Sequence, residues 1–132
     1  MDRATFASWV ERYEEAWRTP GTEALAGIFS ESARYRTGPF EEPFRGLDAI
    51  AEMWEAERRS PDEEFEMRFD LVAVEAEVGV ARVDVRYGPP SEQRYLDLWV
   101  IRLADDGRCS EFEEWPFWPP GTSGSHTRNP VE

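Results

Sequence analysis

Apolar residues in the first 60 positions recur with the period of a helix. One set has the spacing i, i+3, i+4, i+7 and i+11, which places its members on one face of a helix. The set consists of Phe6, Trp9, Val10, Tyr13 and Trp17. Asp2 or Thr5 is a candidate cap for this helix, and Thr19-Pro20-Gly21 ends it.

Two further helices follow this one. A short second helix begins at Thr22 and turns Leu25, Ile28 and Phe29 inward. A third helix has Asp48 near its start, and Ser60-Pro61 stops it. The residues whose spacing indicates this helix are Leu47, Ile50, Met53, Trp54 and Glu57. Between the second and third helices, residues 33–37 are expected to form a short strand, followed by an irregular loop rich in Pro and Gly.

After the third helix the period of the pattern changes to two, which is typical of strands. Four strands are predicted, at 65–76, 78–87, 93–103 and 108–118. The breaks between them are short, and Asp106-Gly107 is a strong hairpin signal, so the strands should form an antiparallel meander. Three helices followed by a long curved antiparallel sheet predict an α+β domain over 1–120. Residues 121–132 are rich in Gly, Ser and Pro and are expected to form a polar tail.

The strand at 93–103 is apolar on both faces. Tyr95, Trp99 and Ile101 lie on one face. Leu96, Leu98 and Val100 lie on the other. An antiparallel strand of this kind must be covered on both sides. Helices can cover one face, and we expect a second copy of the chain to cover the outer face, giving a homodimer.

Charge and composition limit the classes of partner. The formal net charge is -13, so nucleic acid and anionic membranes are poor partners. A hydrophobic fraction of 40% argues against disorder. The sequence contains neither a basic segment followed by an apolar run nor an apolar stretch near ~18 residues, so we expect a soluble, cytoplasmic protein.

The residue types argue against cofactors. Cys109 is the single cysteine and is expected to pack as a small hydrophobic residue. The single histidine, His126, lies in the polar tail, so a metal would have to be held by carboxylates alone, and no metal site is expected. No Gly-rich phosphate loop follows any predicted strand, which argues against a nucleotide.

The order of elements, α-α-β-α-β-β-β-β, resembles the nuclear transport factor 2-like superfamily, which includes the polyketide-cyclase (SnoaL)-like proteins. Three segments carry the resemblance: ERYEEAWRTPGTEALAGIFSESARYRT, FRGLDAIAEMWEAE and LDLWVIRLADDGRCSEFEEW. It implies a cone, in which a curved sheet wraps around helices and encloses one deep pocket, usually in a dimer. The fold hosts isomerases, cyclases, hydrolases, dehydratases and non-catalytic binders, so the fold alone does not give the function.

Ketosteroid isomerase offers one comparison within this superfamily. Tyr13 and Trp54 match the positions of its two pocket tyrosines. Its general-base aspartate would fall on Thr37, and its protonated oxyanion-hole acid on Trp99. Without that base a proton cannot be abstracted beside a carbonyl in the same way, so the resemblance does not imply steroid isomerisation.

Limonene epoxide hydrolase offers a second comparison. Arg82-Val83-Asp84 matches its Arg-x-Asp pair, and Glu114 aligns with its second catalytic aspartate. Tyr35 and Thr37 align with its water-holding tyrosine and asparagine. The resemblance implies Glu114 as base, Asp84 as acid and Arg82 as the bridge between them, with Tyr35 and Thr37 holding the attacking water. Ring-opening hydrolysis needs such a base and such an acid.

The segment ARVDVRY, residues 81–87, has two interpretations. Alternation of charged and apolar residues is most often a solvated strand face with cross-strand ion pairs. In the other interpretation Arg82 and Asp84 point into the pocket, and Asp97 on the next strand joins them on the same face as a third carboxylate.

Two hypotheses follow. One is a cofactor-free acid–base enzyme for a small apolar molecule, closest in type to an epoxide hydrolase, with an isomerase or cyclase of the same fold as a variant. The other is a non-catalytic dimeric module that binds a small ligand. In both, we expect the pocket to be lined by Trp9, Tyr13, Trp17, Trp54, Tyr95, Asp97, Trp99 and Phe112.

Overall fold

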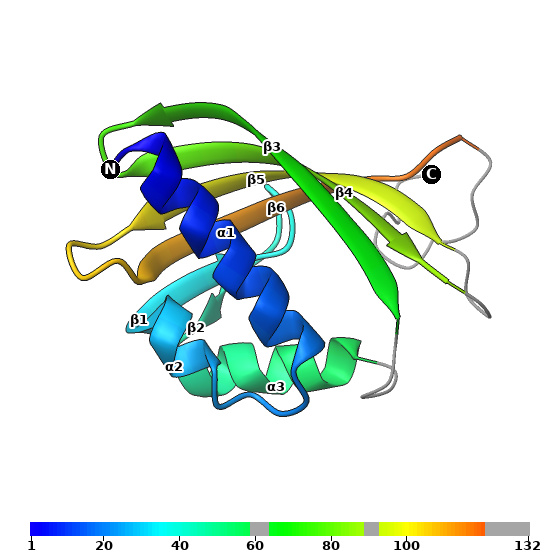
Figure 1. Ribbon diagram of the computed structural model, residues 1–132. Helices are drawn as coiled ribbons and strands as arrows, with labels where there is room; N and C mark the ends of the chain where they lie inside the picture. The colour runs from blue at the N-terminus through cyan, green and yellow to red at the C-terminus, as the bar shows by residue number, and fades with distance from the viewer. Residues whose placement is uncertain (59–63, 89–92, 121–132) are drawn as a thin grey trace.

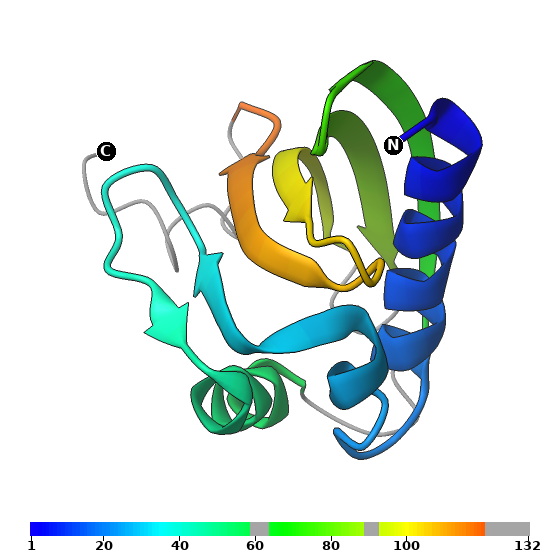
Figure 2. The ribbon, with the colours of Figure 1, turned by 90° about the vertical axis from the view of Figure 1, so that its left-hand side faces the viewer.

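The computed structural model describes residues 1–58, 64–88 and 93–120, and within them a strongly curved sheet surrounds the helices (Figure 1, Figure 2). The helices are α1 (Arg3–Arg18), α2 (Leu25–Ile28) and α3 (Leu47–Glu57). The strands are β1 (Phe29–Arg36), β2 (Phe44–Arg45), β3 (Phe65–Glu75), β4 (Val78–Tyr87), β5 (Arg94–Leu103) and β6 (Cys109–Phe117). Helix α1 crosses the hollow face of the sheet, and α3 packs beside β1 and β2. The α+β class and the cone-like shape are confirmed.

The sheet is mixed, which corrects the prediction of an antiparallel sheet. The strand order is β2-β1-β6-β5-β4-β3. Strands β3 to β6 form the predicted antiparallel meander. Strand β1, however, pairs parallel with β6, with Tyr35 opposite Phe112. The hydrophobic pattern of β1 shows which of its residues are buried but does not show which strand it joins.

The start of β1 differs most from the sequence prediction. The strand begins at Phe29 instead of residue 33, and α2 is a single turn instead of a helix from Thr22. The backbone N–H of Phe29 still donates to the Leu25 carbonyl, but the dihedral angles of Phe29 are already extended. Ala33 is fully buried, so the chain runs into the core directly after α2. Strands β3 to β6 and the third helix lie within a few residues of their predicted bounds, whereas β2 lies in the segment that was expected to be an irregular loop.

Helix α1 is fixed at its start by a cap and along its length by close packing. Asp2 is the cap, because its side chain accepts a hydrogen bond of 2.8 Å from the backbone N–H of Thr5. Phe6 packs directly against the backbone of β4: a Cβ atom at Gly79 would lie 2.5 Å from the Phe6 ring. Glycine at this position therefore sets the distance between α1 and the sheet.

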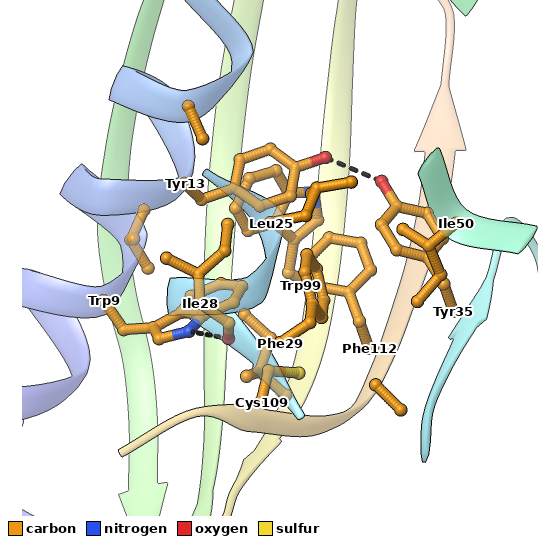
Figure 3. Close-up of a cluster of buried hydrophobic side chains, with 14 of the residues drawn as sticks. Trp9, Tyr13, Leu25, Ile28, Phe29, Tyr35, Ile50, Trp99, Cys109 and Phe112 are labelled. Carbon is orange, nitrogen blue, oxygen red and sulfur yellow. Dashed lines mark hydrogen bonds between the residues drawn. The ribbon is translucent and has the colours of Figure 1, made fainter. Parts of the chain in front are cut away.

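The core beneath α1 is mainly aromatic (Figure 3). Trp9 is fully buried, and its indole N–H donates to the Ile28 carbonyl over 2.9 Å. The rings of Tyr13 and Phe112 are stacked, with 5.3 Å between their centroids. Cys109 is buried in the same cluster, and burial raises the pKa of its thiol, so its predicted role as a packing residue is consistent with its position.

None of the helices in the described ranges has the length and apolar character that crossing a membrane requires.

Candidate functional site

A partly open cavity of about 140 Å³ lies in the hollow of the sheet, beside α1 and the end of α3. Half of its lining residues are aromatic, namely Tyr13, Trp17, Tyr35, Phe65, Tyr87, Tyr95, Trp99 and Trp118. Met53, Met67 and Val85 add apolar surface. The polar lining residues are Thr37, Glu57, Gln93, Asp97 and Glu114. The described lining thus combines aromatic and aliphatic side chains with phenol, hydroxyl, amide and acidic groups, a mixture that a small-molecule site requires.

The aromatic part of the sheet wall is continuous. The ring of Phe65 on β3 lies 5.5 Å from that of Tyr87 on β4. Tyr87 lies 6.3 Å from Tyr95 on β5, and Tyr95 lies 5.8 Å from Trp118, directly after β6. These ring contacts run across the whole meander from β3 to the end of β6. They can do so because all four side chains lie on the hollow side of the sheet.

Two tyrosine hydroxyl groups meet at the cavity. The hydroxyl oxygens of Tyr13 on α1 and Tyr35 on β1 are 2.6 Å apart (Figure 3). Both side chains are buried, and burial raises the pKa of each phenol well above its usual value. The negative charge of Glu114 is the second cause of each raised pKa. Both phenols therefore stay protonated at neutral pH, and the one that accepts the shared hydrogen bond keeps its own proton to donate.

Asp97 on β5 and Glu114 on β6 supply carboxylates to the same wall. Glu114 lies directly opposite Trp99 in the strand pair, so Asp97 is its diagonal neighbour on the same face. Asp97 is only 2% exposed and accepts a hydrogen bond of 3.0 Å from the indole N–H of Trp99. The charges of both carboxylates also help to raise the pKa of Tyr95, although burial is the largest cause there. The charged groups among the described lining residues are thus all acidic.

Arg82 and Asp84 lie on the outer face of the sheet, so the prediction that they point into the pocket is wrong. Arg82 has a 59% exposed side chain, and its Nε atom is 3.6 Å from an oxygen of Asp70. Asp84 pairs with Arg94 at 3.3 Å and with Arg86 at 3.8 Å. These are ion pairs on a solvated strand face, as in the first interpretation of ARVDVRY.

The register of β4 and β5 explains this error. Arg82 lies opposite Leu98, and Asp84 lies opposite Leu96, so both charges share the outer face with these leucines. Asp97 lies opposite Val83, on the other face of the sheet from Asp84. The prediction that Asp97 and Asp84 share a face is therefore wrong. Directly opposed residues point to the same side of a sheet, so the apolar members of the alternation are the ones that face the hollow.

The other predicted site residues divide between cavity and core. The cavity is lined by Tyr13, Trp17, Tyr35, Thr37, Tyr95, Asp97, Trp99 and Glu114. Trp9, Trp54 and Phe112 do not line it and instead fill the core, where all three are at most 1% exposed. Trp9 was expected in the pocket because its helical stripe faces the hollow, and Trp54 because it matches a pocket tyrosine of ketosteroid isomerase. The base of the hollow is instead closed by the packing of these side chains and Phe112.

Several lining residues were not predicted from the sequence. Tyr87 and Phe65 share the inward parity of Val85 and Val83, so the correct parity would have indicated them. Glu57 follows Met53 by four positions on α3, which places a carboxylate beside the apolar stripe of that helix. Trp118 directly follows β6 and keeps the parity of Phe112 and Glu114, so the alternation of the strand predicted at 108–118 would have indicated it.

Within the described parts of the chain, no group of three or more histidine, cysteine, aspartate or glutamate side chains could hold a metal ion. Among the described lining residues none carries a positive charge. The groups offered to a ligand are therefore phenols, a threonine hydroxyl, an amide and carboxylates.

A model of the SnoaL-like domain matches residues 10–112, which is most of the chain. The chain belongs to the SnoaL-like domain family. Its fold and cavity are accordingly those of the nuclear transport factor 2-like superfamily, as the resemblance implied. No curated protein matches the sequence.

Solved structures similar to this SnoaL-like domain share its fold at low sequence identity. A candidate SnoaL-like polyketide cyclase from Jannaschia sp. CCS1 is 18% identical with a TM-score of 0.68, over 88% of this chain and 90% of that one. A candidate ketosteroid isomerase from Kribbella flavida is 15% identical with a TM-score of 0.66, over 93% and 87%. A limonene epoxide hydrolase-like epoxide hydrolase from M. tuberculosis is 13% identical with a TM-score of 0.56, over 83% and 80%.

Proposed function

We propose that this SnoaL-like domain is a cofactor-free acid–base enzyme that moves a proton on a small, largely apolar molecule with a carbonyl group, as isomerases and cyclases do. The observation that carries the proposal is the hydrogen-bonded Tyr13–Tyr35 pair in the same cavity as Asp97 and Glu114. A protonated phenol can donate to a developing oxyanion, and a carboxylate can take the proton.

The mechanism follows from these groups. The carbonyl oxygen of the substrate accepts a hydrogen bond from the tyrosine pair. The Glu114 carboxylate removes a proton from the carbon next to the carbonyl, and the electron pair of that C–H bond forms an enolate whose oxygen the phenol stabilises. The proton then returns from Glu114 to another carbon of the enolate system. In a cyclase reaction the enolate carbon instead attacks a second carbonyl group of the substrate, whose C=O π electrons move to its oxygen, and that alkoxide takes the proton from Glu114. Asp97, next to Glu114, is assigned as the second proton carrier.

Names of similar structures agree with this type of chemistry. Two of them are a candidate ketosteroid isomerase and a candidate SnoaL-like polyketide cyclase. The comparison with ketosteroid isomerase would place the general base at position 37, where this chain has Thr37. In the proposal Glu114 takes the role from the neighbouring strand β6.

Deuterium exchange tests the proposal. Small cyclic and aryl ketones are incubated with the protein in heavy water, and deuterium uptake beside the carbonyl is followed by NMR. Uptake should exceed the buffer rate and fall at least about 100-fold in Glu114→Gln, the range typical of a lost general base. Glu111→Gln, an exposed carboxylate on β6 that pairs with Arg34, is the matched control and should keep full activity. Uptake that is unchanged in Glu114→Gln would contradict the assignment.

A second candidate, epoxide hydrolysis, is favoured by one observation: Tyr35, Thr37 and Glu114 all line the cavity, as the hydrolase comparison implied. The acid in that reaction would be Asp97, because Asp84 lies on the outer face. A panel of terpene and aryl epoxides in ¹⁸O-labelled water tests it. Labelled diol that is lost in Asp97→Asn and Glu114→Gln, but kept in Asp84→Asn, would support the hydrolase.

Absence of both deuterium uptake and diol would instead support the non-catalytic ligand-binding module.

A further inference from the structure

We propose that the ligand of this cavity is a small organic cation, an ammonium group carried on one ring or on a compact apolar frame. The inference concerns the same site and rests on the proposed function for its choice of cavity. It is argued from the aromatic wall, the sign of the charges in the wall and the size of the space.

The aromatic wall provides several rings against which a cation can pack. The ring contacts of Phe65, Tyr87, Tyr95 and Trp118 form one continuous surface on the sheet side. Trp17 and Trp99 line the cavity from α1 and β5. The faces of aromatic rings carry partial negative charge and attract cations, most strongly for tryptophan and when water is excluded.

Two of the lining rings already hold cations on the side of the helices. The Arg18 guanidinium lies 4.0 Å from the centre of the Phe65 ring, and that of Arg58 lies 5.2 Å from the centre of the Trp17 ring. Neither arginine lines the cavity. Arg18 also binds Glu14, and Arg58 donates to backbone carbonyl groups.

The charged groups of the described wall are all acidic. Glu57, Asp97 and Glu114 approach the cavity from α3, β5 and β6. Asp97 and Glu114 are diagonal neighbours on the sheet wall, and their negative charges add to burial in raising the pKa of the Tyr13 and Tyr95 phenols. Beside such acidic groups a cation is stabilised and an anion is repelled.

The volume sets the size of the ligand. The cavity measures about 140 Å³. A closed apolar cavity of about 150 Å³ holds benzene, so one ring fills the enclosed part and a short substituent can reach the acidic groups. The proposed ligand is therefore a single ring joined by a short linker to an ammonium group.

Three probes of nearly equal size and different charge test the inference: benzylammonium, benzyl alcohol and benzoate. Binding is measured by calorimetry at neutral pH. Benzylammonium should bind about ten- to thirty-fold more tightly than benzyl alcohol, and benzoate should bind more weakly than both. Glu114→Gln and Asp97→Asn should each reduce the preference for the cation, and Glu111→Gln on the outer face should leave it unchanged.

The outcomes separate this inference from the proposed enzyme activity. Equal binding of the cation and the alcohol, tightest binding of benzoate, or no binding of any probe at millimolar concentration would overturn the inference. If one of these binding results were found and neutral ketones still took up deuterium, the proposed function would stand and only the ligand class would be wrong. Preference for the cation without proton transfer on any ketone, amino ketones included, would keep the ligand class and overturn the activity.

Discussion

The hydroxyl groups of Tyr13 and Tyr35 depend on each other, because both are buried and each is the other's partner at 2.6 Å. Tyr35→Phe leaves the Tyr13 hydroxyl without this partner, and the expected loss in unfolding free energy is about 1–3 kcal/mol. Tyr13→Phe should cost a similar amount. The double variant should cost less than the sum, since no buried hydroxyl then lacks its partner. Urea unfolding of the four proteins measures this cycle; strict additivity would show that the hydrogen bond contributes nothing.

The same residues predict how stability depends on alkaline pH. Burial raises the pKa of Tyr13, Tyr35 and Tyr95 well above the usual value near 10. Above pH ~10 the unfolded chain loses these protons while the folded protein keeps them, so the unfolding free energy falls as pH rises. Below pH ~10 both states are protonated and these residues contribute no slope. Each phenol should lower stability by about 1.4 kcal/mol per pH unit in the alkaline range.

Tyrosinate absorbance provides the measurement. The absorbance of Tyr13, Tyr35 and Tyr95 should appear together with the loss of folded structure in a pH titration. Smooth ionisation of all tyrosines near pH 10 in a protein that stays folded would contradict the prediction.

At the scale of residues, the sequence predicted the chemical groups of the site better than their directions. Tyr35, Thr37 and Glu114 line the cavity as expected. Arg82 and Asp84 do not, because a strand with one charged and one apolar face gives the same alternation whichever side the hollow is on. Only the pairing with β5 decides the side.

Phe6 of helix α1 lies very close to Gly79 of strand β4, which predicts the effect of a small substitution. Gly79→Ala places a methyl group 2.5 Å from the Phe6 ring and should lower the unfolding free energy by about 1–3 kcal/mol through overpacking. Gly27→Ala in α2 is the control, since a methyl group added there would meet nothing within 4 Å. Thermal unfolding of both variants measures the difference; a Gly79→Ala protein as stable as the Gly27→Ala protein would contradict close packing.

At the scale of elements, the sequence predicted α1, α3 and the meander well because each is held by local contacts. The stripe of α1 and the alternation of β3 to β6 repeat over many residues, so the pattern is clear. The start of β1 and the two-residue strand β2 were missed since both depend on distant partners. A pattern of burial does not identify the strand that a short segment joins.

At the scale of the whole molecule, the expected homodimer stays a prediction. The outer face carries an apolar stripe, defined here as Leu96, Leu98, Val100, Trp115 and Phe117. Leu96 is 38% exposed and Phe117 is 59% exposed. Leu98 lies opposite Trp115, so the members are neighbours on one surface. Exposed apolar patches of this kind typically mark an interface.

Sedimentation of the protein tests the homodimer. The mass should be twice that of the 15.3 kDa chain, and Leu98→Arg should reduce it to a single chain. Val72→Arg, at an exposed position of β3 outside the stripe, should leave the mass unchanged. A wild-type protein that sediments at the mass of one chain would contradict the prediction.

The parallel pairing of β1 with β6 has a consequence for folding kinetics. Strands β3 to β6 can pair in sequence through short turns, but the Ser30 hydroxyl meets the Cys109 carbonyl across 79 positions of chain. Closing so long a loop is entropically costly and slow. Substitutions in β1 should therefore speed unfolding while leaving the refolding rate nearly unchanged. The meeting of Tyr35 with Tyr13 then belongs to the final stage of folding, so a refolding chain completes its cavity only after most of its sheet has formed.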